Sequence, residues 1–288
     1  MSQVPLQPDQ ALSIRPRRES GGSALLQRAI KFSITIALLY GALVAAFYVG
    51  QEKIIFRPSV LPASHQFTLP DVTEVSIPVD GAVLSALHFR QPGARGVVFY
   101  LHGNGGNLAT WVRSTDFYRS IGYDLFMIDY RGYGKSTGRI ESEEQLHADV
   151  MAAWRLVAPQ YADKRIVIFG RSLGTALAAR LSTQVQSSWT VLVSPFTNLE
   201  DLRGELYPFL PRGLMRYPLP TDQWLLQAKS PVTILHGTAD ELISVEHARR
   251  LKALAPTTEL IEISGGTHNN LHHLPLYVDA LKERFAKL

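Results

Sequence analysis

The sequence predicts an α/β fold in which a mostly parallel β-sheet is flanked by helices. Three observations lead to this prediction. Short continuous apolar runs alternate with stretches whose apolar residues have helical spacing. Polar or glycine-rich segments directly follow several of these runs, and the carboxyl ends of parallel strands would bring such segments to one edge of the sheet. The apolar content of 46% is sufficient for a large buried core.

The first element is an apolar run from Phe32 to Gly50 that contains no charged residue. A helix needs about 20 mostly apolar residues to cross a bilayer, and this run is just long enough. An excess of basic residues before it favours a cytoplasmic N-terminus and export of the remaining chain. We therefore predict a cytoplasmic basic tail at 1–31, a transmembrane signal-anchor at 32–50 and an exported domain at 51–288. The basic residues are Arg15, Arg17, Arg18, Arg28 and Lys31.

Two alternatives exist for this run. A cleaved signal peptide would have a shorter apolar region of about 7–15 residues, and the best cleavage site here, Val44-Ala45-Ala46, is weak. A buried helix of a soluble protein is the other alternative, but the run lacks the polar stripe of a surface helix. An uncleaved anchor is therefore favoured.

The remaining chain supplies the strands and helices in order. Residues 51–70 contain three prolines and read as an extended lead-in. Asp80-Gly81 is a turn signal between two strands, Val75–Val79 and Leu84–Phe89, which we expect to form a hairpin. The further strands are expected at 96–101, 125–128, 165–169, 190–193, 232–235 and 260–263. Helices are expected at about 107–120, 141–157, 173–182, 246–254 and from about 275 onward.

One segment breaks this alternation. Residues 195–230 carry five prolines together with several aromatic side chains. We expect this segment to be a small cap inserted into the domain, with Phe196, Tyr207 and Trp224 as substrate contacts. An ordinary surface excursion, whose aromatic residues pack on the domain, is the alternative.

A nucleophile is predicted at Ser172. The pentapeptide Gly170-Arg171-Ser172-Leu173-Gly174 directly follows the apolar run 165–169 and precedes a stretch of good helix formers. The pattern G-x-S-x-G between a strand and a helix is the nucleophile elbow. The serine lies on a strained turn, so the residues two positions before and after it must lack bulk, which explains both glycines.

The base is predicted to be His268. A serine hydroxyl needs a base that removes its proton, and a third group must orient that base. His268 lies in a glycine-rich loop directly after the strand expected at 260–263. His272 and His273 are close rivals, whereas His236 and His247 read as structural residues.

The acid that orients this base is predicted to be Asp240. In this type of site the chain order is Ser, then Asp or Glu, then His, and Asp240 follows the strand expected at 232–235. Glu241 is the nearest substitute and Asp222 a remote one. An aspartate that caps a helix or turn is the other interpretation of Asp240. Asp129 precedes the serine and reads as structural.

Acyl transfer also needs donors for the negative charge that develops on the carbonyl oxygen. We assign these donors to the backbone N–H groups of Leu173 and Asn104, the latter in the glycine-rich loop His102–Asn107. A phosphate-binding loop is the lesser interpretation, since the loop lacks the Gly-Lys-Ser/Thr ending of a P-loop.

Composition excludes several classes of function. The chain has no cysteine, which excludes disulfides, cysteine-rich zinc sites and thiol catalysis. The formal net charge is only +4, much of it near the N-terminus, so a nucleic-acid partner is not expected. The oligomeric state stays open.

Taken together, five motifs resemble those of single-pass, membrane-anchored α/β-hydrolase-domain proteins, which are related to serine-aminopeptidase-type hydrolases. The resemblance covers about residues 51–288 in order. It implies the α/β-hydrolase fold, the triad Ser172, Asp240 and His268, and neither a metal nor an organic cofactor. Asn270 departs from it, since an acidic residue is expected there. The motifs are Leu101–Asn107, Asp129–Ser136, Gly170–Gly174, His236–Asp240 and Gly266–Asn269.

The predicted function is a serine hydrolase that cleaves an ester or thioester, of acyl or lipid type, through an acyl-Ser172 intermediate. The substrate would be a small-molecule acyl ester or a lipid. An aminopeptidase-like serine peptidase and a non-catalytic, membrane-tethered interaction protein are the alternatives, because a fold alone does not determine the substrate.

Overall fold

A computed structural model describes residues 21–112 and 115–288 of the chain. The chain divides into two compact units, Met1–Ala46 and Phe47–Leu288, and each is described by itself. Residues 1–20, which hold the first three cations of the predicted basic tail, lie outside the described residues.

Helix α1 (Gly21–Ile55) is longer at both ends than the predicted anchor. Its apolar part has the length and composition needed to cross a membrane, although a signal sequence near an N-terminus has the same properties. In the first unit its large apolar side chains are exposed, with Leu38 at 69% and Leu39 at 66%. Residues 51–55, predicted as extended, are instead the last residues of this helix.

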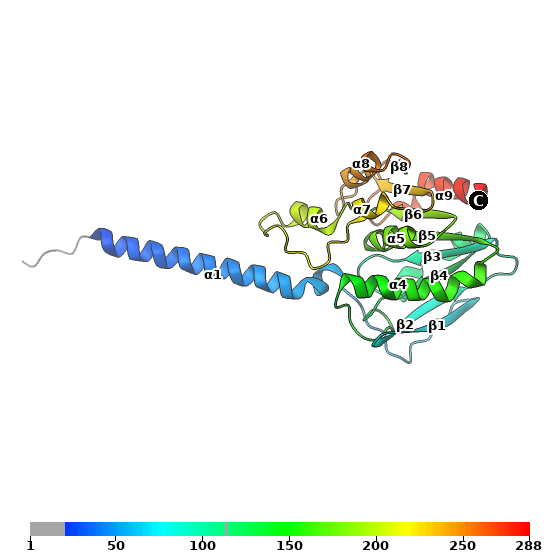
Figure 1. The fold of residues 1–288 in the computed structure, drawn as a ribbon, viewed down its shortest axis with the longest axis horizontal. Coiled ribbons are helices and arrows are strands. Elements are labelled where there is room, and N and C mark those ends of the chain that lie inside the picture. The colour runs from blue at the N-terminus through cyan, green and yellow to red at the C-terminus, as the bar shows by residue number, and fades with distance from the viewer. Residues whose placement is uncertain (1–20, 113–114) are drawn as a thin grey trace, which may run out of the picture. The chain divides into compact units, whose positions relative to one another are not determined.

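An eight-stranded sheet forms the centre of the second unit (Figure 1). Its strand order is β1-β2-β4-β3-β5-β6-β7-β8. The pairs β1–β2 and β2–β4 are antiparallel, and all other neighbours are parallel. The strands are β1 (Val72–Val79), β2 (Ala82–Phe89), β3 (Gly96–Leu101), β4 (Tyr123–Ile128), β5 (Arg165–Arg171), β6 (Trp189–Val193), β7 (Val232–Gly237) and β8 (Glu259–Ile263).

The predicted strands and the predicted hairpin are confirmed. Val79 pairs with Ala82 across the turn Asp80-Gly81, and Gly81 has a φ of 69°. This left-handed conformation is the one that glycine adopts without steric cost. The strands differ from the predicted ranges only at their ends.

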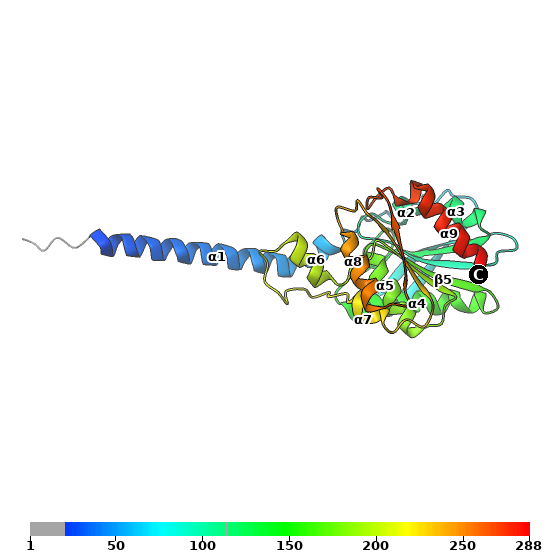
Figure 2. The same cartoon turned by 90° about the horizontal axis from the view of Figure 1, so that it is seen from above.

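Helices cover both faces of the sheet (Figure 2), as α/β proteins require to bury a parallel sheet. Helices α4, α5, α7 and α8 lie on one face, and α2, α3 and α9 lie on the other. The predicted helix at 107–120 is two short helices, and residues 113–114 between them lie outside the described residues. The bounds are α2 (Leu108–Trp111), α3 (Thr115–Ser120), α4 (Glu143–Val157), α5 (Leu173–Gln184), α7 (Thr221–Leu225), α8 (Val245–Leu254) and α9 (Pro275–Lys287).

The hydrophobic core consists of two clusters, one on each face of the sheet. Strand β3 shows how one strand serves both, because successive side chains of a strand point to opposite faces. Val97 and Phe99 belong to the cluster that includes residues of α4 and α5, whereas Val98 and Tyr100 belong to the cluster that includes residues of α9. All four side chains are buried.

The segment 195–230, predicted as a cap, holds helix α6 (Leu199–Leu206) and helix α7. Asn198 caps the first of these helices, since its side chain accepts a hydrogen bond from the N–H of Asp201. Between the helices the chain runs as a loop that contains Leu210 and Tyr217, both buried.

Candidate active site

The predicted nucleophile lies on a sharp turn between β5 and α5. Ser172 has φ 52° and ψ −121°, a strained backbone for a residue that has a side chain. A Cβ on Gly170 would collide with the carbonyl oxygen of Gly174, and a Cβ on Gly174 would collide with that of Leu101. Both glycines of the motif are therefore required by close backbone packing, and the strained turn was expected from the sequence.

The structure brings the three predicted triad residues together. His268 Nε2 lies 3.1 Å from Ser172 Oγ, and His268 Nδ1 lies 2.8 Å from Asp240 Oδ2. A carboxylate only accepts hydrogen bonds, so Nδ1–H donates to Asp240 and Nε2 accepts from the serine hydroxyl. Ser172 and Asp240 are buried, at 6% and 8% exposure, while the imidazole is slightly more exposed.

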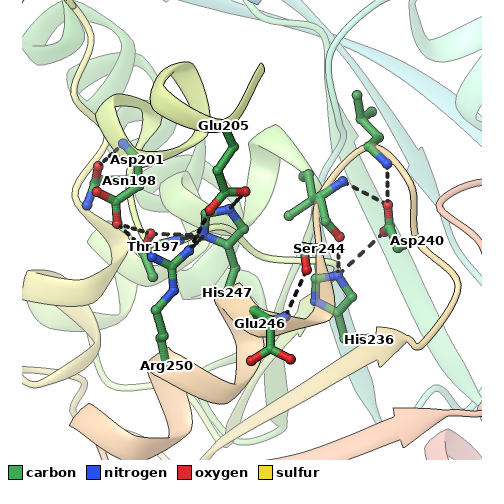
Figure 3. A network of polar contacts seen from close by, with 12 residues as sticks. Thr197, Asn198, Asp201, Glu205, His236, Asp240, Ser244, Glu246, His247 and Arg250 are labelled. Atoms are coloured by element: carbon green, nitrogen blue, oxygen red, sulfur yellow. Dashed lines mark hydrogen bonds and ion pairs between the residues drawn. The ribbon is translucent and has the colours of Figure 1, made fainter. Parts of the chain in front are cut away.

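Asp240 is held on both of its oxygens (Figure 3). Its Oδ1 accepts from the N–H groups of Leu242 and Ile243 at 3.0 and 2.9 Å. The imidazole of His236 approaches its Oδ2 at 3.5 Å. Burial by itself would raise the pKa of Asp240, but hydrogen bonds from His236, His268 and Ile243 outweigh it and hold the pKa well below its ordinary value. The carboxyl group is therefore ionised in the neutral pH range.

His236 reads as a structural residue in the sequence, and the structure shows that it supports Asp240. Its ring is fully buried, and its Nε2 lies 2.8 Å from the carbonyl oxygen of Ile243. The carbonyl can only accept, so Nε2 carries a proton and the same N–H faces Asp240. The sequence signal was its place at the end of a buried strand, four residues before the predicted acid.

Two contacts position the loop that carries His268. The guanidinium of Arg171 donates to the carbonyl oxygen of His268 at 3.1 Å. The side chain of Asn270, where an acidic residue was expected, accepts from the N–H of Thr267 at 2.7 Å through its amide oxygen. An amide oxygen accepts this bond as a carboxylate would, so Asn270 is compatible with the loop conformation.

The loop that holds Asn104 follows β3 and is braced from two sides. The N–H of Gly105 donates to the carbonyl oxygen of Phe56 at 2.7 Å. The hydroxyl of Tyr130 donates to the carbonyl oxygen of His102 at 2.8 Å. Asn104, Ser172 and Leu173 line one cavity, as two oxyanion donors next to a nucleophile should.

Asp129 supports the same loop, in keeping with the structural role predicted for it. Its fully buried carboxylate accepts from the N–H of Leu108 at 3.0 Å, and the imidazole of His102 lies 3.5 Å away. Burial raises the pKa of Asp129, against the opposing effects of His102 and the Leu108 N–H. This contact couples the loop after β4 to the loop after β3.

The rival residues lie elsewhere. The rings of His272 and His273 face each other, with centroids 3.8 Å apart. Glu241 is exposed, and the side chain of Asp222 accepts from Asn198 Nδ2 at 3.0 Å. His268, in contrast, contacts both Asp240 and Ser172.

A cavity of about 190 Å³ opens beside Ser172. Of the three predicted substrate contacts, Phe196 and Tyr207 line it, but Trp224 does not. Trp224 packs edge-on against His147, with Arg180 over its ring, and borders a separate, larger groove of about 860 Å³. That larger groove is mixed in charge and contains none of the three triad residues.

Helix α1 contributes residues to the cavity that the sequence did not suggest. Phe47, Ile54 and Ile55 all line it. Among residues 21–112 and 115–288 there is no group of three or more His, Asp or Glu side chains that could hold a metal ion.

Comparisons with known proteins show which family the chain resembles. Residues 92–217 match the family described as serine aminopeptidase, S33. The chain is 30% identical over 251 residues to an uncharacterized protein of Mycobacterium tuberculosis. The alignment covers 84% of this chain and 89% of that protein. It is 30% identical over 203 residues to alpha/beta hydrolase domain-containing protein 17B of Xenopus laevis, covering 68% of each chain.

Solved structures show the same fold. An esterase of Pyrococcus furiosus superposes with a TM-score of 0.64 at 22% identity, covering 81% of this chain and 98% of that structure. A structure of Est1E from Butyrivibrio proteoclasticus with bound ferulic acid superposes with a TM-score of 0.62 at 20% identity, covering 74% and 98%.

Proposed function

Because the chain belongs to the α/β-hydrolase family of serine hydrolases, we propose that it cleaves an ester or thioester of acyl or lipid type through an acyl-Ser172 intermediate. The observation that carries this proposal is the chain of contacts from Asp240 through His268 to Ser172, at 2.8 and 3.1 Å.

The reaction begins with a proton transfer. His268 Nε2 takes the proton of the Ser172 hydroxyl while Oγ attacks the carbonyl carbon of the substrate, which gives a tetrahedral oxyanion. As the oxyanion collapses, the bond to the leaving alkoxide or thiolate breaks and the imidazolium returns the proton to it. A water molecule then attacks the acyl-enzyme by the same steps, and the acid and Ser172 are released.

Asp240 keeps the imidazole in its working tautomer. Its low pKa leaves it ionised, so its Oδ2 accepts from Nδ1–H and directs the lone pair of Nε2 toward the serine. The same negative charge stabilises the imidazolium that forms during each attack. The N–H groups of Asn104 and Leu173, together with the N-terminus of α5, are proposed to receive the oxyanion.

The lining of the cavity favours an ester over a peptide with a free amino terminus. A peptidase of that kind needs an acidic group to bind the ammonium. The described residues that line the cavity include two cations, Arg57 and Arg203, and no Asp or Glu. Most of the others are apolar, which suits an acyl chain.

We also propose that α1 anchors the enzyme in a membrane, with the N-terminus in the cytoplasm and the domain at 51–288 exported. Support comes from the apolar length of the helix and from the basic residues that precede it. A reporter that is active only outside the cytoplasm, fused to the C-terminus, should give signal. Absence of signal with full-length protein present would reverse this topology.

Labelling with a fluorophosphonate probe tests the nucleophile. Wild-type protein should be labelled and Ser172→Ala should not. Ser182→Ala is the matched control, because Ser182 lies on α5, the helix that follows Ser172, and its hydroxyl donates to the carbonyl oxygen of Ala179. This variant should label normally. Labelling that persists in Ser172→Ala would remove Ser172 from the reaction. Preference for aminoacyl anilides over acyl esters would select the peptidase alternative.

A further inference from the structure

The last turns of α1 are built into the hydrolase unit through a buried amide. Gln51 is fully buried, and its Nε2 donates to the carbonyl oxygen of Leu214 at 3.0 Å. Its Oε1 accepts from the N–H of Arg216 at 2.8 Å. Both polar atoms of the Gln51 amide are therefore hydrogen-bonded to the backbone of residues 214–216. An exposed, flexible linker would not maintain this geometry.

Neighbouring side chains reinforce this attachment. Glu52 Oε1 accepts from the hydroxyl of Tyr217 at 3.0 Å and from Arg216 Nη1 at 2.6 Å. Phe56, which is 2% exposed, packs edge-on against Tyr217 with ring centroids 5.1 Å apart. Residues 47–56 are thus part of the enzyme's folded unit, whatever the role of the helix before them.

The face of this helix end that points into the cavity is apolar. Phe47, Ile54 and Ile55 line the same cavity as Ser172. The centroids of the Phe47 and Tyr207 rings lie 5.8 Å apart. Helix α6 supplies another part of the lining through Leu199, Leu202 and Leu206.

Helix α6 is fixed to the body of the domain, so this part of the lining is well defined (Figure 3). Glu205 accepts from the buried ring of His247 at 3.0 Å and from Arg250 at 2.9 Å. The hydroxyl of Thr197, just before the helix, lies 3.0 Å from His247 Nδ1. These contacts connect α6 to α8.

Part of the cavity lining is exposed to solvent. Three of these side chains are large and apolar, Ile54 at 40%, Leu206 at 43% and Leu242 at 44%, and Arg57 is an exposed cation in the same lining. Exposed apolar side chains that gather around a cavity mark a site for an apolar partner rather than for water. They line the same cavity as Ser172.

We propose that the end of α1 is a substrate-binding element, in which Phe47, Ile54 and Ile55 contact the acyl chain of a long-chain ester whose carbonyl group lies at Ser172. This proposal rests on the proposed function and names its substrate class. In the sequence, Phe47 lies near the end of the apolar stretch at 32–50 that is proposed to cross the membrane, and Ile54 and Ile55 follow shortly after it, so the acyl chain of a membrane lipid is the substrate that fits this wall.

The test compares ester chain lengths on the full-length protein in non-ionic detergent. Phe47→Ala and Ile54→Ala should each lower the ratio of kcat/KM for a palmitoyl ester to kcat/KM for an acetyl ester by roughly tenfold, since each removes contacts that only a long chain makes. Val49→Ala is the matched control on the same helix, because Val49 is 74% exposed and does not line this cavity. Its ratio should equal that of the wild type.

A filling variant gives an independent readout. Ile54→Trp should shift the preferred acyl length to shorter chains, because the indole ring is larger than the isoleucine side chain and would fill part of the cavity. If Phe47→Ala, Ile54→Ala and Ile54→Trp all keep the wild-type ratio while acetyl esters are cleaved, this proposal is overturned and the proposed function stands. If wild-type protein neither cleaves any ester nor reacts with fluorophosphonate, the proposed function itself fails.

A comparison of vesicle-bound and soluble ester tests whether the substrate is a membrane lipid. A long-chain ester held in phosphatidylcholine vesicles that contain the enzyme should be cleaved, and Phe47→Ala should slow this cleavage. Cleavage of only the soluble form of the ester, with none in vesicles, would overturn the assignment to a membrane lipid.

Discussion

The guanidinium of Arg171 donates to the backbone carbonyl of His268 at 3.1 Å, which ties the residue before Ser172 to the loop that carries His268. The guanidinium also lies over the ring of Trp111, 5.5 Å from its centroid. The side chain is only partly exposed and contacts both the loop of His268 and the end of helix α2. Arg171 is therefore a positioning residue in this arrangement.

Arg171→Met should lower kcat by about tenfold with little change in KM, because a small displacement of the base weakens proton transfer more than substrate binding. Steady-state kinetics with a short-chain ester measures both constants. Arg180→Met is the matched control, since Arg180 makes the same type of contact with Trp224, outside the Ser172 cavity, and should leave kcat unchanged. Equal losses in the two variants would contradict the positioning role.

Asp240→Asn should reduce kcat by a factor on the order of 10⁴. The asparagine would favour the wrong tautomer of His268, even if the positions of the side chains were retained. Asp222→Asn serves as the comparison, because Asp222 is the remote alternative acid and bonds Asn198 instead. Rates near wild type for Asp240→Asn, with a large loss for Asp222→Asn, would reverse the assignment.

Replacement by alanine should have opposite effects at two glycines, one in the strained turn and one in helix α6. Gly174→Ala should destabilise the protein by about 3 kcal/mol or prevent folding, because its Cβ meets the backbone of Leu101. Gly204→Ala should be neutral or raise stability by about 0.5–1 kcal/mol, because Gly204 lies in α6 with no atom within 4 Å of an added Cβ. Thermal unfolding followed by tryptophan fluorescence measures both. A Gly174→Ala protein as stable as wild type would show that the turn can relax.

Acid sensitivity is expected at His88. Burial, and then the charge of Arg90, lower the pKa of His88 to about 4, against the effect of Asp124. Between pH 6.5 and about 4 the ring of His88 stays neutral in the folded state, whereas in the unfolded chain, with its ordinary pKa of 6.5, the ring is protonated. Stability from this group is therefore fully present above pH 6.5 and is lost as the pH falls from 6.5 toward about 4.

His88→Gln removes this titration. The loss of stability between pH 7 and pH 4.5 should be smaller in the variant by about 2–3 kcal/mol. Urea unfolding at the two pH values measures the difference. His273→Gln is the control for the substitution itself, because His273 is exposed. An identical acid dependence in wild type and His88→Gln would show that His88 is not the group responsible.

The sheet could be predicted because each strand is a local pattern. Strand β3 is a continuous apolar run and is buried at every position, as a strand covered on both faces must be. The hairpin at Asp80-Gly81 was likewise predictable, since the turn type demands a residue that tolerates positive φ. The end of α1 was not, because residues 51–55 form helix through contacts with residues 214–217, far along the chain.

The residues proposed for chemistry follow from the sequence for a related reason. Ser172 comes directly after β5, whereas Asp240 and His268 lie in the loops that follow β7 and β8. Parallel strands bring their carboxyl ends, and therefore these loops, to one edge of the sheet. Substrate contacts have no such rule. Trp224 looked as suitable as Tyr207, but only the packing of α7 against α5 shows that it lies on another surface.

Sequence patterns alone were enough to derive the α/β fold and the three residues that meet at 2.8 and 3.1 Å, because each strand and the motif that follows it are local patterns. The tertiary structure was needed to reveal that His236 supports Asp240, that Arg171 holds the loop of His268, and that Phe47 lines the cavity. Such contacts join residues whose separation in the chain says nothing about their distance in space, so they exist only once the whole domain has packed.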